Sequence, residues 1–192
     1  MGRRGLRGDA ATLSLSVDRL ARAGADFFIC PDNTAHLALE EAGADLALPG
    51  LRITEVVAGQ AARDHRQRVG VLGTRYLMDG PLYPRVFAAH GIAAEIPADD
   101  DRRIVNEIIF GELVNGVFTD PSLQQYVRVI ERLAARGCDA VALVCTEIPL
   151  LVTPEASPLP TLDSTRLLAR AAFDIAVGEH AMPSWRGGPA GS

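Results

Sequence analysis

The stretches DRLARAGADFFICPD (residues 18–32) and ERLAARGCDAVALVC (residues 131–145) decide the fold, because one pattern occurs in both. When Arg19 is aligned with Arg132, four further positions are identical: Leu20, Ala21, Gly24 and Asp26 align with Leu133, Ala134, Gly137 and Asp139. Each copy has the pattern of a helix, a Gly-x-Asp turn and an apolar strand. The repeat therefore predicts two similar halves.

Strands and helices alternate along the rest of the chain. We expect helices over residues 12–23, 34–42, 74–78, 84–90, 99–114, 121–136 and 163–177, and strands over residues 26–30, 68–73, 93–96 and 139–145. This alternation predicts an α/β fold with parallel sheets. Gly, Pro and Ser dominate after residue 179, which predicts a disordered tail over residues 179–192.

Reactive side chains end both repeated strands. Asp32 closes the first strand and Cys145 the second, and polar residues follow each: Asn33 and Thr34, and Thr146 and Glu147. Open α/β sheets bind ligands at the carboxyl ends of their strands, where helix N-termini favour a carboxylate or phosphate. Two facing halves would hold Asp32 and Cys145 across a cleft, an arrangement suited to taking a proton from carbon on one side and returning it on the other. The alternative is an old duplication whose strand ends have no chemistry.

The composition excludes several classes of protein. The chain has no lysine, so all 19 of its Lys+Arg residues are arginine. Pyridoxal phosphate enzymes need a lysine for the Schiff base, and an ordinary P-loop needs one for phosphate. The net charge of −5 argues against a nucleic-acid partner or an anionic membrane surface.

Cysteine and histidine usage indicates a reduced protein without a metal. Cys30, Cys138 and Cys145 lack C-x-x-C spacing, which excludes a zinc ribbon and a thioredoxin motif. The four histidines have no ligand spacing, so we expect no metal site. No apolar stretch approaches the roughly 18 residues of a membrane span, and no secretory signal is evident. We therefore expect a cytoplasmic protein.

Five short blocks resemble a known family. PDNTAH (residues 31–36) resembles the first motif, P-C-N-T-x-H, of the aspartate/glutamate racemase superfamily, and VCTEIPLL (residues 144–151) resembles its second motif, C-T-E. VGVLGT (69–74), IIFGELVNG (108–116) and LDST (162–165) are similar to further family blocks. The resemblance implies a cofactor-independent amino-acid racemase built from two pseudo-symmetric α/β domains, acting on a small amino or carboxylic acid as a homodimer.

The resemblance also implies roles for single residues. Cys145 is one of the two groups that flank the substrate α-carbon, and Asp32 stands where the family has the other cysteine. Glu147 tunes the electrostatics of Cys145 or simply caps a helix, and His36 is a structural hydrogen-bond partner. Four polar residues are expected to bind the substrate carboxylate: Asn33, Thr34, Thr74 and Thr146. Thr34 and Thr146 also suit a purely structural role as helix caps.

Two departures from the family pattern affect the expected organisation. The first is the aspartate at position 32, for which Cys30 is a possible stand-in. The second is a short first half, which we expect to lack one strand–helix–strand unit, so either the start is assigned too late or the chain is a truncated homologue. We expect an incomplete first domain over residues 1–66 and 159–178, and a second domain over residues 67–158.

Three functions remain open on the sequence alone. The leading one is a racemase or epimerase that uses Asp32 and Cys145. The second is a single-cysteine decarboxylase or cis–trans isomerase of a small dicarboxylic acid, and the third is a truncated inactive homologue. Only Arg52 and Arg75 stand out as possible ligands for a distal substrate carboxylate, and both suit solvated surface roles equally well.

Overall fold

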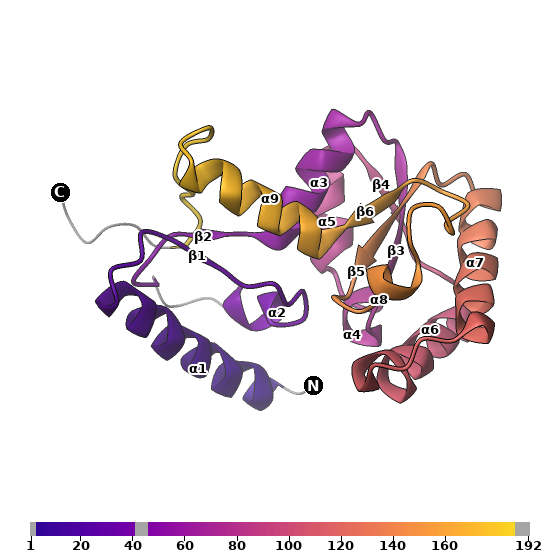
Figure 1. Ribbon diagram of the computed structural model, residues 1–192, viewed down its shortest axis with the longest axis horizontal. Coiled ribbons are helices and arrows are strands. Elements are labelled where there is room, and N and C mark those ends of the chain that lie inside the picture. Colours follow the sequence, from indigo (N-terminus) through magenta and orange to yellow (C-terminus); the bar gives the residue numbers. More distant parts are fainter. Residues whose placement is uncertain (1–2, 41–45, 187–192) are drawn as a thin grey trace.

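The computed structural model describes residues 3–40 and 46–186 of the chain (Figure 1). The elements in chain order are α1 (Arg3–Arg22), β1 (Phe28–Ile29), α2 (His36–Leu39), β2 (Gly50–Leu51), α3 (Ile53–Arg63), β3 (Arg68–Gly73), α4 (Arg75–Met78), α5 (Leu82–Ala89), β4 (Ala93–Glu95), α6 (Asp99–Gly111), a 3-10 helix η1 (Leu113–Asn115), α7 (Asp120–Ala135), β5 (Ala140–Val144), α8 (Ile148–Leu151), β6 (Thr161–Asp163) and α9 (Ser164–Ala176).

The strands form two parallel sheets, which confirms the predicted α/β class. One sheet has four strands in the order β4-β3-β5-β6, and the other pairs β1 with β2. The four-stranded sheet with the helices from α3 onward is here called the large lobe. The elements α1, β1, α2 and β2 form the small lobe, at the left of Figure 1.

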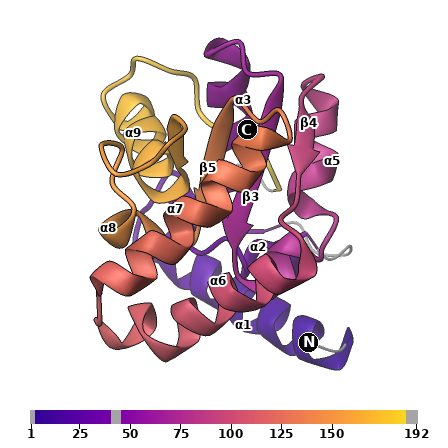
Figure 2. The same ribbon diagram turned by 90° about the vertical axis from the view of Figure 1, so that its right-hand side faces the viewer.

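The central strands of the large lobe are buried on both faces. Val69 and Val71 of β3 belong to a core shared with α3 and α5, whereas Leu72 belongs to a core shared with α6 and α7. Because side chains alternate along a strand, consecutive apolar residues supply both cores. Figure 2 shows α6 and α7 in front of β3 and β5. These two layers of helices hold the carboxyl ends of β3 and β5 in fixed positions.

The repeated aspartate of the second copy fixes the start of this sheet. Asp139 accepts hydrogen bonds from the backbone N–H groups of Gln67, at 2.7 Å, and Arg68, at 3.4 Å. Gly137 before it has a φ of +87°, a left-handed conformation that glycine adopts readily. The Gly-x-Asp turn therefore ends α7 and joins the first residues of β3 and β5.

The small lobe has its own core and holds the end of the described chain. Val17, Phe28 and Leu39 pack together, with Trp185 against them. Gly50 donates its backbone N–H to the Trp185 carbonyl at 3.0 Å. We predicted disorder from residue 179 onward, but this part of the segment lies against the small lobe because the indole ring and backbone find partners there. Residues 187–192 lie outside the described residues.

Several elements have no counterpart among the predicted ones. The helix α3 and the short strands β2 and β6 were not predicted. The helix α1 begins earlier than the predicted residue 12. The helix α2 ends earlier than the predicted residue 42, and residues 41–45 lie outside the described part of the chain. The segment containing β6 and α9 was assigned to the first domain, yet β6 pairs with β5 of the large lobe. The division into domains stays a prediction. Within the described ranges, no helix combines the length and apolar character needed to cross a bilayer.

Candidate functional site

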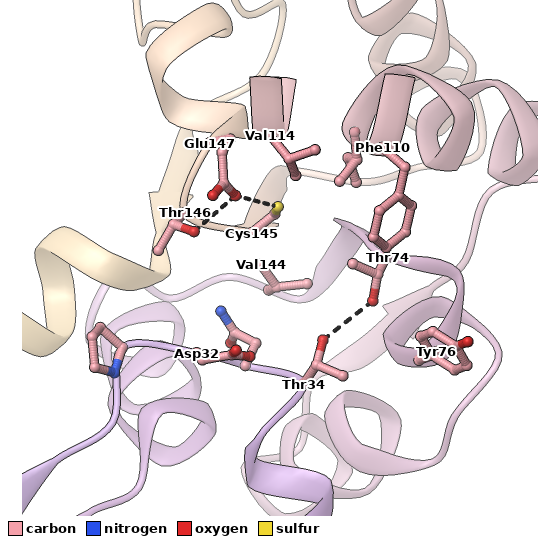
Figure 3. Close-up of a pocket in the computed structure, with 13 residues that line it drawn as sticks. Asp32, Thr34, Thr74, Tyr76, Phe110, Val114, Val144, Cys145, Thr146 and Glu147 are labelled. Atoms are coloured by element: carbon pink, nitrogen blue, oxygen red, sulfur yellow. Dashed lines mark hydrogen bonds between the residues drawn. The ribbon is translucent and has the colours of Figure 1, made fainter. Parts of the chain in front are cut away.

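A cavity of about 290 Å³ lies where the small lobe meets the carboxyl ends of β3 and β5 (Figure 3). Residues from both lobes line it, and they include every residue that the sequence predicted for the site: Asp32, Asn33, Thr34, Thr74, Cys145, Thr146 and Glu147. The remaining lining residues were not predicted: Pro31, Tyr76, Ile109, Phe110, Val114 and Val144. The structure therefore brings the predicted set together, while their chemical roles stay predictions.

Cys145 follows the last residue of β5 and is buried. Its Sγ donates a hydrogen bond to Glu147 Oε2 at 2.9 Å. Burial, and then the hydrogen bond to Glu147, raise the pKa of the Cys145 thiol to about 12. Cys145 is therefore a protonated thiol near neutral pH, a state in which it can give a proton to carbon.

Glu147 holds the hydroxyl and the thiol of its two neighbours. Its Oε2 accepts from Thr146 Oγ1 at 2.8 Å as well as from Cys145. Burial raises the pKa of Glu147, but the hydrogen bonds from Cys145 and Thr146 outweigh burial and leave the pKa below its ordinary value. The ionised carboxylate therefore accepts hydrogen bonds from both neighbours and favours the protonated state of Cys145.

Asp32 enters the cavity from the small lobe, and Figure 3 shows Asp32 and Cys145 extending from different lobes. The Asp32 side chain is exposed, and its Oδ1 accepts a hydrogen bond from the Ala35 backbone N–H at 3.0 Å. Its Oδ2 has no hydrogen-bond partner among the residues that the structure describes. One carboxylate oxygen is thus held by the backbone while the other is available to a ligand.

Two threonine hydroxyls meet across the boundary between the lobes. Thr34 Oγ1 and Thr74 Oγ1 lie 3.3 Å apart, and either can donate (Figure 3). Thr34 belongs to the first motif and Thr74 follows the end of β3. A ligand carboxylate placed here would meet hydroxyls from both lobes.

Asn33 is buried and its side chain already has partners. Its Nδ2 donates to Ser164 Oγ at 2.9 Å, and its Oδ1 accepts from Tyr83 Oη at 2.5 Å. Ser164 Oγ in turn donates to the Leu143 carbonyl at 2.9 Å. The Asn33 side chain therefore ties the first motif to β5, α5 and α9. Ser164 lies in the LDST block, whereas no sequence signal pointed to Tyr83.

His36 and Cys30 lie beside the cavity and do not line it. The Ile53 backbone N–H donates to His36 Nε2 at 3.3 Å, so the ring proton is on Nδ1, which donates to the Asp32 carbonyl at 2.9 Å. Burial lowers the pKa of His36. The structural role expected for His36 fits these contacts. Cys30 instead packs against the small-lobe core, and burial raises the pKa of its thiol.

Neither candidate arginine lines the cavity. Arg52 pairs with Glu40 and Glu55. Arg75 pairs with Asp79 at 2.9 Å. No cluster of three or more His, Cys, Asp or Glu side chains that could hold a metal is found among residues 3–40 and 46–186.

Comparisons with known proteins identify a family and several relatives. The model of the Asp/Glu/Hydantoin racemase family matches residues 2–172. The broad specificity amino-acid racemase RacX of Bacillus subtilis is 26% identical over 157 residues, which are 80% of this chain and 66% of that protein. The chain thus spans just under two thirds of the length of this curated relative.

Solved structures show the same fold. A candidate Asp/Glu racemase from Yersinia pestis is 36% identical with a TM-score of 0.83, covering 91% of this chain and 76% of its own. An aspartate racemase homologue from Pyrococcus horikoshii is 26% identical with a TM-score of 0.80, covering 92% of this chain and 77% of its own.

Proposed function

Because the chain belongs to the Asp/Glu/Hydantoin racemase family, we propose that it is a cofactor-independent amino-acid racemase or epimerase. In this proposal Asp32 and Cys145 exchange a proton with the substrate α-carbon from opposite sides. Thr34 and Thr74 hold the α-carboxylate with their hydroxyl groups, Thr146 joins them once its hydroxyl turns from Glu147 Oε2 to the ligand, and the Asn33 backbone closes the same end of the site.

One observation carries the proposal. Asp32 and Cys145 follow the repeated strands, come from different lobes and line one cavity. A base on one side and an acid on the other are what inversion at carbon requires, because the proton leaves one face and returns to the other. The cavity lies near the lower limit of pockets for small molecules, about 300–1,000 Å³, so it suits a single amino acid.

Asp32 and Cys145 exchange the roles of base and acid between the two directions of racemisation. In one direction Asp32 takes the α-proton and the Cys145 thiol supplies its own proton to the opposite face. In the other direction Cys145 acts as the thiolate, and Asp32 as the carboxylic acid, that the first direction leaves behind; Glu147 Oε2 at 2.9 Å accepts a hydrogen bond from the thiol but does not take its proton. The racemase names of the relatives favour this function over a decarboxylase or a cis–trans isomerase.

Exchange of the α-proton with solvent tests the proposal directly. The full chain is incubated with a panel of amino acids in deuterated water, and loss of the α-proton signal is followed by NMR. We expect exchange that Cys145→Ala reduces by at least about a hundredfold, the scale of general acid–base catalysis, while Asp32→Asn slows it. Cys138→Ala changes a buried cysteine that does not line the cavity and should keep full activity.

The outcome also separates the alternatives. Release of carbon dioxide from malonate-type acids or isomerisation of maleate-type acids, without α-proton exchange, would support the single-cysteine functions instead. If the chain has the circular dichroism spectrum of a folded protein but reacts with none of these compounds, the result would support the inactive homologue.

We further propose that the protein works in the cytoplasm as a homodimer. The three free cysteines suit a reducing compartment. Val117 and Phe118 expose apolar side chains beyond α6, a feature typical of contact surfaces. Sedimentation of the full chain would show a single monomer species if the dimer is wrong.

A further inference from the structure

Part of the cavity wall is apolar. Phe110 and Val114, from α6 and η1, and Tyr76, from α4, line it while keeping 51%, 49% and 47% of their surface exposed. Figure 3 shows Phe110 and Val114 on the side of the cavity that carries Cys145 and Thr74. Large apolar side chains left uncovered around a cavity are typical of a surface that a ligand covers.

In the described part of the chain, the charged side chains that line the cavity are carboxylates. Among its lining residues the only charged ones are Asp32 and Glu147. Arg52 pairs with Glu40 away from the cavity, and Arg75, which lies beside Tyr76 and Phe110 in a neighbouring pocket, is paired with Asp79. A second carboxylate on the substrate would therefore lose water against carbon atoms and meet like charge without an unpaired cation, which is unfavourable.

A cationic side chain fits the wall no better. Glu147 Oε2 already accepts from Cys145 and Thr146, and Asp32 Oδ1 accepts from Ala35. In the proposed function Asp32 Oδ2 faces the α-carbon, so an ammonium or guanidinium group lying along Phe110 and Val114 would give up its hydration for the aromatic face of Phe110 alone.

On the premise of the proposed function, we infer that the substrates are amino acids with uncharged apolar side chains, of the size of leucine, methionine or phenylalanine. The α-carboxylate lies at the threonine hydroxyls, the α-carbon lies between Asp32 and Cys145, and the side chain covers Phe110, Val114 and Tyr76. Aspartate and glutamate are poor substrates.

A substrate panel tests this inference. The α-proton exchange of leucine, methionine and phenylalanine is compared with that of aspartate and glutamate, and with that of lysine and arginine, by kcat/KM. We expect the apolar group to exceed both charged groups by at least about tenfold, since one methylene in an apolar pocket is worth roughly 10–200-fold. Faster exchange of either charged group would overturn the inference and leave the proposed function intact.

A charge placed in the wall should invert the preference. Val114→Arg adds a cation beside the substrate side chain, and we expect kcat/KM to fall for leucine and rise for glutamate, each about tenfold. The matched control is Leu150→Arg, which adds the same charge to an exposed apolar position of α8 outside the cavity. An unchanged preference in Val114→Arg, in a chain whose circular dichroism matches the parent, would contradict the placement of the side chain.

Binding separates failure of the inference from failure of the function. Ligands that bind only the folded state raise Tm, so leucine should raise Tm of the Cys145→Ala chain while glutamate at equal concentration should not. A leucine-specific shift without exchange in the parent chain would refute the racemase and support the apolar site. A glutamate-specific shift would refute the apolar site.

Discussion

At the scale of single residues, burial and the hydrogen bond to Glu147 together set the pKa of Cys145. The pKa of the Cys145 thiol is raised to about 12, and burial is the largest cause of this increase. The hydrogen bond and the negative charge of Glu147 add to it. Reactivity at this position therefore depends on the neighbour two residues along the chain as much as on the cysteine.

Replacing the carboxylate should lower the pKa of the thiol. In Glu147→Gln the charge disappears while burial remains, so we expect the pKa of Cys145 to fall below about 12 but to stay above that of a free cysteine, about 8.5. The rate at which iodoacetamide alkylates the Cys145 peptide, measured by mass spectrometry against pH, should rise at lower pH than in the parent. Glu155→Gln, at an exposed position, serves as the control, and equal profiles for the two variants would contradict the assigned cause.

The sequence predicted the polar residues of the site, but it did not predict the residue that holds Asn33 or the apolar residues that line the cavity. Asp32 and Cys145 were found because a repeat ends at both, and parallel strands bring their carboxyl ends to one edge of a sheet. Tyr83 was not found because its contact with Asn33 depends on how α5 packs. Phe110 and Val114 were not found because an amphipathic helix does not indicate which of its exposed apolar side chains faces a cavity.

At the scale of elements, close contact between β3 and β5 positions the site. A Cβ atom on Gly73 would lie 2.6 Å from Val144 Cγ2 and 3.0 Å from the Val144 carbonyl oxygen. These strands end next to Thr74 and Cys145. Glycine at this position lets both strands deliver their site residues to one cavity.

Adding one methyl group should therefore damage the element and the site together. Gly73→Ala overpacks the contact and should lower the free energy of unfolding by about 1–3 kcal/mol, with slower α-proton exchange. Gly59→Ala in α3 has room, because the nearest atom is Arg63 Nη1 at 3.6 Å, and should instead stabilise by up to about 1 kcal/mol. Urea unfolding followed by circular dichroism compares them, and similar free energies for the two variants would refute the argument.

The same scale explains which elements the sequence could predict. The strands β3 and β5 are apolar runs bounded by turn residues, so their pattern was clear. In contrast, β2 and β6 have two and three residues and do not lie in longer apolar runs of the kind that contain the equally short β1 and β4, so only their pairing with a neighbouring strand defines them. A local sequence pattern does not predict strand pairing between segments that are distant along the chain.

At the scale of the whole molecule, His36 links the small lobe to the large lobe and to the end of the described chain. Its ring contacts Asp32 and the start of α3, and it stacks on Trp185 with centroids 5.6 Å apart. The neutral ring is required, since Nε2 accepts a hydrogen bond. Protonation would break this junction.

Stability should consequently decline in mild acid. Burial lowers the pKa of His36 in the folded chain below its ordinary 6.5, so just below pH 6.5 the unfolded chain binds more protons than the folded one. Stability is then full above 6.5 and is lost as the pH falls toward the lower folded value. Urea unfolding followed by Trp185 fluorescence should show this slope in the parent.

Substitution identifies the residue responsible. His36→Gln should have a lower free energy of unfolding at all pH values but a shallower decline between neutral and mildly acidic pH. His65→Asn alters an exposed histidine at a left-handed position that asparagine accepts, and should keep the slope of the parent. A slope that survives in His36→Gln would assign the acid sensitivity elsewhere.

The Thr34–Thr74 pair has a consequence for how any acid enters. A hydroxyl has one proton, so only one of these two donates within the pair, and both donate to a carboxylate only when that direct hydrogen bond is given up. In the proposed function the bound acid therefore replaces one hydrogen bond between the lobes with two that pass through itself. Ligand binding should accordingly stabilise the contact between the lobes as well as the fold of each.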